Sequence, residues 1–333
     1  MAPVTDALRT PDDRFSGLPG YAFEPHYLDV SAEGLGPVRM HYLDEGPADG
    51  PVALLLHGQP TWSYLYRTVV PVLVAAGVRV VAPDNIGFGR SDKPVRPTDY
   101  TFARHIEWTR SLVTQLDLRS VTLVAQDWGG PIGLSVLAEE TDRFAAVVAA
   151  NTILHTADPA LADRLTWAVH GLGESRVVLE EALVDYLLHT QRAPELRASD
   201  FIGFATTSTL APEVLAAYDA PFPDASYTAG LRQMTALLPL TRNDVGARIG
   251  RRTMRALERF DRPFVTCYSD GDPATRGWDQ VFQERVPGAR GQRHVTIPGA
   301  GHFLQEDAGE ELARVVADVV SASATDPSGW RSA

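Results

Sequence analysis

An acidic residue, Asp127, lies in a short turn of the kind that exposes a catalytic nucleophile. The apolar run Val121–Ala125 predicts a buried strand, and the pattern of Gly129–Glu140 predicts a helix. Small residues stand two positions on either side of Asp127, as in the strand–turn–helix nucleophile elbow. A carboxylate with an ordinary pKa of about 3.9 is ionised at neutral pH, and it can attack an electrophilic carbon to form an ester. The alternative is an ordinary turn aspartate that caps the following helix.

Two loops could supply the other groups that such a nucleophile needs. One is His57–Pro60, which follows the apolar run Val52–Leu56. Its glycine lets a backbone N–H point at a developing oxyanion, and in this layout the second N–H comes from Trp128, the residue after the nucleophile. We expect His57 itself to be structural.

The other loop holds His302, which is flanked by a glycine-rich segment late in the chain. A base at this place fits the chain order nucleophile, acid, histidine. The acid is then expected after the apolar run Phe264–Tyr268, where Asp270 and Asp272 are both available. The chain order alone leaves both candidates open, and one of them is expected to be a turn former.

The elements that must position these loops alternate along the chain. Apolar runs of strand length alternate with helical patterns, which predicts an α/β fold with a mostly parallel sheet covered by helices on both faces. The predicted strands are Val38–Leu43, Val52–Leu56, Val78–Ala82, Val121–Ala125, Ala145–Ala149, Phe264–Tyr268 and His294–Ile297. The predicted helices are Ser63–Ala76, Phe102–Leu116, Pro131–Glu140, Trp278–Arg285 and Glu306–Ser321.

The alternation stops at about Asn151 and resumes at about Arg262. The segment between them is helical, loop-rich and contains several prolines, which predicts a helical cap inserted after the strand that follows the elbow. We therefore expect a core domain of residues 1–151 and 260–333 and a cap domain of residues 152–259. A cap above the nucleophile would exclude water and shape a pocket.

The composition argues against several classes of function. The chain has 333 residues, and its formal net charge of −12 argues against a nucleic-acid partner, because binding phosphates requires Lys and Arg. This charge suits an uncharged substrate. The single cysteine, Cys267, permits no intrachain disulfide. No secretory signal or membrane-spanning stretch is visible, so we expect a cytoplasmic protein without a membrane partner. No metal cluster or nucleotide fingerprint is visible, and no cofactor is implied beyond water.

Five segments of the chain match a known family. They are His57–Arg67, Pro83–Pro94, Gln126–Gly130, Tyr218–Tyr227 and Gly299–Glu306. With these segments the chain resembles the haloalkane dehalogenases of the α/β-hydrolase superfamily over most of its length. The elbow and the HGxP loop are shared with epoxide hydrolases, whereas the cap segment and the extended run after His57 are more specific. The resemblance implies an α/β-hydrolase fold with an inserted helical cap, and it favours Asp272 over Asp270 as the acid.

The resemblance also implies a mechanism for a small uncharged halogenated substrate. Asp127 would displace halide from carbon and form an alkyl ester, which water activated by His302 and its partner Asp272 would hydrolyse to a primary alcohol. The backbone N–H groups of Gln59 and Trp128 would stabilise the oxyanion. His302 must be neutral to act as the base, so activity should fall as the pH drops through its ordinary pKa of about 6.5.

The resemblance further implies two tryptophans that bind the halide ion, since an indole N–H donates without a competing acceptor. Trp128 fits the first place, and Trp167 in the early cap fits the second. Gln59 is a departure from the family, and its side-chain amide could assist or replace Trp167. The segment Arg232–Thr235 also departs from the family and leaves the shape of the pocket open. The other tryptophans, Trp278 among them, are expected to lie outside the site.

Two alternatives remain open. An epoxide hydrolase would use the same Asp and His but would protonate the epoxide oxygen with tyrosines of the cap, and Tyr186, Tyr218 and Tyr227 are available. The second tryptophan favours halide, because an indole is not an acid. A non-catalytic homologue that binds a small ligand would be compatible with the same residues. We expect the chain to be a monomer or a homodimer.

Overall fold

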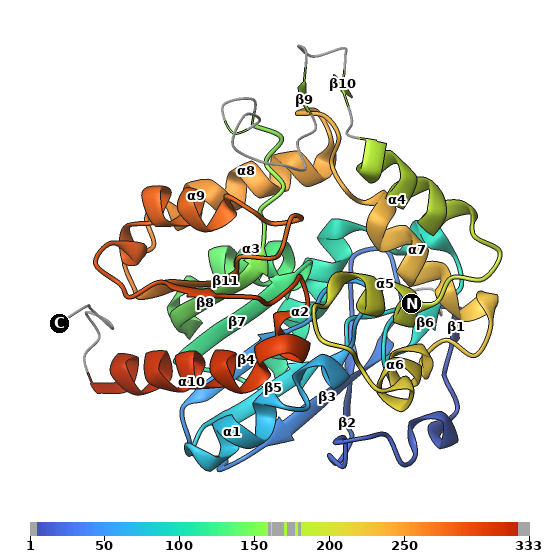
Figure 1. The fold of residues 1–333 in the computed structure, drawn as a ribbon, viewed down its shortest axis with the longest axis horizontal. Helices are drawn as coiled ribbons and strands as arrows, with labels where there is room; N and C mark the ends of the chain where they lie inside the picture. Colours follow the sequence, from blue (N-terminus) through green and yellow to red (C-terminus); the bar gives the residue numbers. More distant parts are fainter. Residues whose placement is uncertain (1–4, 159–160, 162–169, 172–176, 179–180, 326–333) are drawn as a thin grey trace.

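A computed structural model of the chain describes residues 5–158, 161, 170–171, 177–178 and 181–325, and its centre is one eight-stranded sheet (Figure 1). The strand order is β12-β11-β8-β7-β4-β5-β3-β2. Neighbouring strands are parallel from β12 to β5, and β3 and β2 are antiparallel at one edge. The strands of this sheet are β2 His26–Val30, β3 Val38–Glu45, β4 Val52–Leu56, β5 Arg79–Pro83, β7 Val121–Asp127, β8 Phe144–Thr152, β11 Phe264–Ser269 and β12 Val295–Ile297.

The central strands are apolar along their whole length because both of their faces are covered. Every residue of β4 is buried, and so is all of β7 except Asp127 at its end. This is the pattern expected of parallel strands between two helical layers. The sequence prediction missed β2, because it is an edge strand in which only Val30 is buried.

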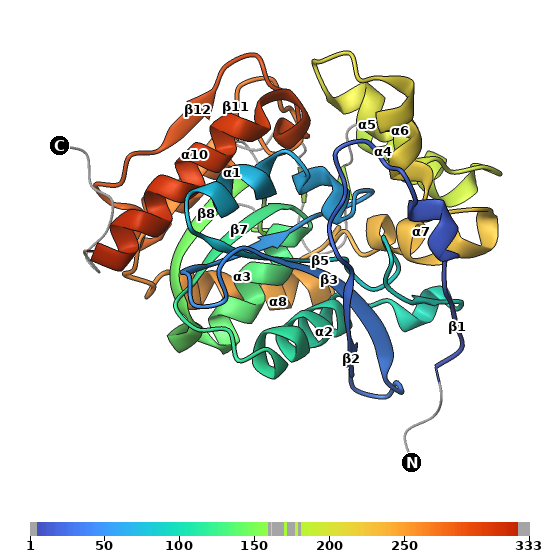
Figure 2. The same cartoon turned by 90° about the horizontal axis from the view of Figure 1, so that it is seen from below.

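Helices cover both faces of the sheet (Figure 2). Helices α1 and α10 pack together on one face, whereas α2, α3 and α8 pack together on the other. Helix α3, which follows the elbow, is buried along nearly its whole length between the sheet, α2 and α8. The core helices are α1 Val69–Ala75, α2 Phe102–Gln115, α3 Gly129–Glu139, α8 Val245–Leu257, α9 Trp278–Arg285 and α10 Leu304–Thr325.

Among the described residues, four α-helices between β8 and α8 form a separate layer beside the sheet, which we call the cap (Figure 1, right). They are α4 Glu181–Arg192, α5 Ala198–Ala205, α6 Pro212–Asp219 and α7 Ala229–Ala236. Helix α8 falls within the predicted cap range 152–259, yet it packs on α3 and so lies with the core helices. Its Thr253 hydroxyl is 2.8 Å from that of Ser135 on α3.

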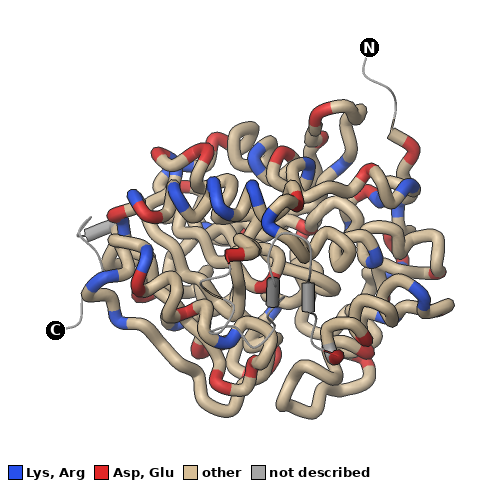
Figure 3. Tube along the Cα trace, turned by 90° about the horizontal axis from the view of Figure 1, so that it is seen from above, with Lys and Arg blue, Asp and Glu red and all other residues tan. Residues whose placement is uncertain are grey.

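Short strand pairs complete the described structure. Strand β1, Ala7–Leu8, pairs with β6, Lys93–Pro94, and β9, His170–Gly171, pairs with β10, Val177–Val178. Acidic and basic residues are interspersed along the chain in Figure 3 rather than separated onto opposite sides. None of the described helices combines the length and the apolarity needed to cross a membrane.

Candidate active site

The turn after β7 holds Asp127 in a conformation that few residues adopt. Asp127 has a φ of 49°, in the left-handed region, and Trp128 then starts α3 with a φ of −61°. The Thr152 hydroxyl donates to the Asp127 carbonyl oxygen at 2.6 Å and so fixes the turn from β8. A Cβ at position 58 would collide with the Asp127 carboxylate, so the neighbouring loop can approach only because residue 58 is glycine. Strained backbone of this kind persists where the surroundings enforce it.

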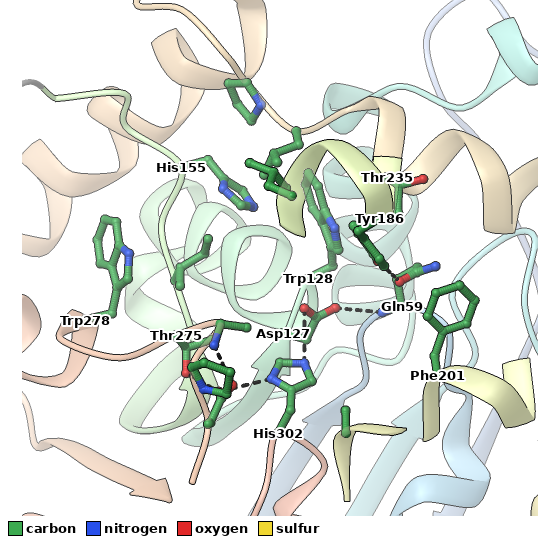
Figure 4. Close-up of a pocket in the computed structure, with 18 of the residues that line it drawn as sticks. Gln59, Asp127, Trp128, His155, Tyr186, Phe201, Thr235, Thr275, Trp278 and His302 are labelled. Atoms are coloured by element: carbon green, nitrogen blue, oxygen red, sulfur yellow. Dashed lines mark hydrogen bonds and ion pairs between the residues drawn. The ribbon is translucent and has the colours of Figure 1, made fainter. Parts of the chain in front are cut away.

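Three of the predicted residues come together beside this turn (Figure 4). His302 Nε2 lies 3.5 Å from Asp127 Oδ2, and His302 Nδ1 lies 3.0 Å from Asp272 Oδ2. Asp272 is buried and also accepts hydrogen bonds from the Ala274 N–H at 2.8 Å and the Thr275 hydroxyl at 2.5 Å. Asp270, the other candidate acid, is exposed and accepts from a backbone N–H in the loop before His302.

The two carboxylates change the protonation of the histidine between them. Burial disfavours the imidazolium, but the charges and hydrogen bonds of Asp272 and Asp127 outweigh it and raise the pKa of His302 to about 10. Burial likewise opposes ionisation of Asp272, yet His302 and the two donors above lower the pKa of that carboxyl. The ordinary value near 6.5 assumed for His302 from the sequence is therefore wrong for the resting site. The two carboxylates favour the imidazolium form of His302 in the resting site.

The loop His57–Pro60 presents a backbone donor to the nucleophile. The Gln59 N–H donates to Asp127 Oδ1 at 2.7 Å. His57 lies behind this loop: its Nε2 accepts from the Asn85 N–H at 2.9 Å, and its Nδ1 is 2.8 Å from the Gly58 carbonyl oxygen. These two bonds require a neutral ring with the proton on Nδ1, and burial lowers the pKa of His57 accordingly. His57 thus supports the loop.

Two of the three proposed halide donors, Trp128 and Gln59, are described in the structure. Trp128 lines the cavity described below, and no hydrogen bond joins its indole N–H to a described residue. Gln59 is engaged differently: its Oε1 accepts from the Tyr186 hydroxyl at 2.6 Å, and its Nε2 is buried without a partner among the described residues. Trp167, the other predicted donor, lies outside the described residues.

A cavity of about 820 Å³ extends from Asp127 between the sheet and the cap. Its lining is largely apolar and includes Leu183, Phe201 and Leu238. It reaches the surface at exposed residues, of which Phe204 is 91% exposed. Thr235 lines the cavity, whereas its neighbour Met234 is in the buried core. An apolar pocket with a few polar groups at one end is the usual form of a small-molecule site.

Two lining residues were missed by the sequence analysis. His155 follows β8 and packs against Trp128 with ring centroids 4.6 Å apart, and burial lowers its pKa to about 4. Trp278 at the start of α9 also lines the cavity, although it was expected to lie outside the site. The position of His155 directly after a central strand was the signal that could have found it, since ligands bind at the carboxyl ends of parallel strands.

Of the three cap tyrosines, Tyr186 is the one found among the described lining residues. Tyr218 is buried and donates to Glu306, which also pairs with Arg67 of the core. Tyr227 packs against the core without lining the cavity.

The loop of His302 is bonded directly to the end of α5. The His302 N–H donates to the Ala205 carbonyl oxygen at 2.8 Å, and the Thr207 hydroxyl donates to the Gly299 carbonyl oxygen at 2.6 Å. Asp307 accepts from the N–H groups of both Thr207 and Gly301. The base and this part of the cap are therefore held together by one main-chain hydrogen bond and by the side chains of Thr207 and Asp307.

The chain is similar to known proteins over nearly its whole length. Residues 51–179 match the family model described as the alpha/beta hydrolase fold. A haloalkane dehalogenase of Psychrobacter cryohalolentis is 46% identical over 94% of this chain and 97% of its own length. Haloalkane dehalogenase 1 of Mycobacterium tuberculosis is 47% identical over 92% of this chain and 96% of its own length. The tetrameric structure of the haloalkane dehalogenase DpaA from Paraglaciecola agarilytica superposes with a TM-score of 0.81 at 33% identity, covering 93% of this chain and 97% of that one. With a mostly parallel sheet, a carboxylate at its elbow and relatives of this kind over nearly its full length, the chain belongs to the haloalkane dehalogenases, hydrolases that cleave carbon–halide bonds.

Proposed function

We propose that this enzyme hydrolyses small uncharged haloalkanes through an ester on Asp127, with His302 as the base and Asp272 as the acid that orients it. The observation that carries the proposal is the contact series Asp127–His302–Asp272 at the end of an apolar cavity. An apolar cavity favours an uncharged alkyl chain, because burying a charge without a partner is costly.

In the first step Asp127 Oδ2 attacks the carbon that bears the halogen, and the halide leaves with the electron pair of the broken bond. Oδ1 accepts the Gln59 N–H, which turns the other oxygen toward the substrate. The step needs no base, since a carboxylate attacks carbon without losing a proton. The protonated His302 beside it is therefore compatible with this step.

Formation of the ester prepares the base for the second step. The ester carries no charge, so the contributions of Asp127 to the raised pKa of His302 disappear, and the imidazolium gives up its proton to solvent more readily. Neutral His302 then deprotonates a water molecule that attacks the ester carbonyl. The N–H groups of Gln59 and Trp128 stabilise the oxyanion, and its collapse releases the alcohol and restores the Asp127 carboxylate.

The halide is bound in this scheme by Trp128 and by the pair of Tyr186 and Gln59. The Trp128 indole N–H has no partner among the described residues and lies beside the nucleophile. Gln59 Nε2 is too buried to meet an ion in its present orientation, but a half-turn of the amide would place it on the Tyr186 oxygen. The Tyr186 hydroxyl would then be released toward the halide, whereas Trp167 stays a candidate from sequence alone.

Halide release and trapping of the ester test the scheme. The purified enzyme should release bromide from members of a bromoalkane panel, and His302→Phe should accumulate an alkyl adduct visible in the intact mass. Release of one bromide per His302→Phe molecule without added mass would reject the ester, and no bromide from any member would reject the substrate class.

We also propose a cellular location and an oligomeric state for this enzyme. A lone cysteine that is fully buried suits a reducing cytoplasm. We expect a monomer or a homodimer, although the Paraglaciecola relative is described as tetrameric. Light scattering on the purified chain tests this expectation, and a tetramer would contradict it.

A further inference from the structure

Tyr186 brings to the cavity a hydrogen-bond donor that is also an acid, and a departing halide needs no acid. Its hydroxyl donates to Gln59 Oε1 at 2.6 Å, and its ring packs edge-on against Phe201 at 5.7 Å between centroids. Figure 4 shows the ring of Tyr186 on the same side of Asp127 as Trp128, with its hydroxyl pointing to Gln59. The phenol is thus held in one place by a polar contact at its tip and an aromatic contact at its side.

The Tyr186 hydroxyl and Asp127 are close because both form a hydrogen bond with Gln59. The N–H of Gln59 donates to Asp127 Oδ1 at 2.7 Å, and its side-chain Oε1 accepts from Tyr186. The separation of the two reactive groups is therefore limited to about the span of one glutamine. Asp127 attacks a carbon from a distance of about 3 Å. An oxygen bonded to that carbon can then face the Tyr186 hydroxyl.

The leaving group decides what a phenol adds to the site. A halide leaves as a weak base and needs only hydrogen-bond donors, which an indole supplies. The oxygen of an epoxide leaves as an alkoxide, about as basic as the conjugate base of water, whose pKa is about 15.7. Its departure is assisted by an acid that transfers a proton in the transition state. A phenol, with an ordinary pKa of about 10, is such an acid.

We propose that this enzyme also opens small apolar epoxides, with Asp127 as the nucleophile and Tyr186 as the general acid that protonates the epoxide oxygen. The inference rests on the proposed function, because it uses the same nucleophile and the same base. Asp127 Oδ2 forms a bond to an epoxide carbon, the carbon–oxygen bond breaks, and the released electron pair takes the Tyr186 proton. The products of this step are a hydroxyalkyl ester and a phenolate.

The remaining protons balance within the site. The charge of Asp127 is lost in the ester, so His302 gives up its proton, which restores the phenol through water in the cavity. Neutral His302 then activates a second water molecule for hydrolysis of the ester, and it ends the cycle protonated again. The net reaction consumes one epoxide and one water and yields one diol.

Two features of the surroundings suit Tyr186 to this task. Burial, together with the charge of Asp127, raises the pKa of Tyr186, so the phenol is protonated in the resting site although it is a weaker acid than a free tyrosine. Gln59 Nε2 is buried without a partner among the described residues. A half-turn of that amide lets Nε2 donate to the phenolate oxygen, and it frees the O–H for the substrate beforehand.

The other described polar groups of the cavity are less able to act as the acid. Burial lowers the pKa of His155 to about 4, so this ring is neutral at pH 7. The Thr235 hydroxyl already donates within the cap and is a far weaker acid than a phenol. Tyr218 donates to Glu306 and does not line the cavity.

A matched pair of substrates and a matched pair of variants test the inference. Bromohexane and hexene oxide have similar chains, but the leaving group is a halide in the first and an alkoxide in the second. The wild-type enzyme should release bromide from the first and form hexanediol from the second. Tyr186→Trp keeps a donor without an acid, so diol formation should fall at least about 10-fold more than bromide release. Tyr186→Phe should lower both activities, and diol formation more.

The outcomes separate this inference from the proposed function. His302→Phe should gain the mass of one hexene oxide, and that adduct should form far more slowly when Tyr186→Trp is added. Bromide release without diol or adduct from the epoxide would overturn the inference and leave dehalogenation standing. Diol formation that survives in both folded Tyr186 variants, as judged by their thermal unfolding, would overturn the role of Tyr186. Neither bromide nor any adduct from the wild type and His302→Phe would overturn both proposals.

Discussion

The two sides of the cavity hold their reactive groups by different means. On the core side, Asp127 is fixed by the strained turn after β7, by the Gln59 N–H and by the Thr152 hydroxyl on its carbonyl oxygen. On the cap side, Tyr186 is held by a side-chain hydrogen bond and an aromatic contact. Main-chain donors and acceptors are present whatever the side chains are, whereas side-chain contacts change with one substitution. The nucleophile is therefore held by the core, whereas the acid that we propose for epoxides comes from the cap.

The largest expected effect comes from removing the nucleophile. Asp127→Ala should lower the rate of bromide release at least about 10⁴-fold, because no other described carboxylate is held at the elbow. The measurement is bromide release under single-turnover conditions, with thermal unfolding as the control for folding. Residual activity within 100-fold of the wild type would mean that the core side does not supply the nucleophile.

A smaller but still large effect should follow from removing the acid that orients the base. Asp272→Asn leaves the shape of the side chain but removes the charge that favours the imidazolium, and kcat should fall about 10³–10⁴-fold. The first turnover should survive, since alkylation of Asp127 needs no base. Rapid mixing with a bromoalkane should therefore show a burst of bromide equal to the enzyme concentration. Loss of the burst to the same extent as kcat would show that Asp272 also positions Asp127.

The titration of His302 measures how strongly Asp127 and Asp272 on the core side stabilise its imidazolium form. Both carboxylates stabilise the imidazolium, so the protonated ring should predominate up to a pH of about 10 in the resting enzyme. Replacing Asp127 by Asn removes one of the two charges, and the pKa of His302 should fall. Nuclear magnetic resonance of the imidazole follows the titration directly. A midpoint near the ordinary 6.5 in both proteins would contradict the coupling.

The smallest expected effect concerns the attachment of the cap. Tyr218→Phe removes the hydroxyl that donates to Glu306, but Arg67 still pairs with that carboxylate. The free energy of unfolding should fall by about 1–2 kcal/mol in urea titrations. Tyr227→Phe is the matched control, and it should change stability by less than about 0.5 kcal/mol. An equal loss in both variants would show that the Tyr218 hydroxyl does not anchor the cap.

Sequence patterns predicted the core side better than the cap side, for a physical reason. Apolar runs identify the central strands, because parallel strands are buried on both faces, and each catalytic loop follows such a strand. The amphipathic edge strand β2 carries a weaker signal, since only Val30 is buried. The sequence could name Tyr186 only as one of three cap tyrosines, because its place depends on how α4 packs over Gln59. The protonation of His302 also escaped prediction, because it depends on distances to two carboxylates from distant parts of the chain.

The bonds between α5 and the loop of His302 bear on how products leave. Lifting this part of the cap would break the hydrogen bond from His302 to Ala205 and those from Thr207 to the neighbouring loop. Such an opening would disturb the base during every cycle. The lining of the cavity includes the exposed Phe204, so we expect alcohol and halide to leave there with these bonds intact. If products leave without the cap opening, the catalytic residues keep their contacts from one turnover to the next.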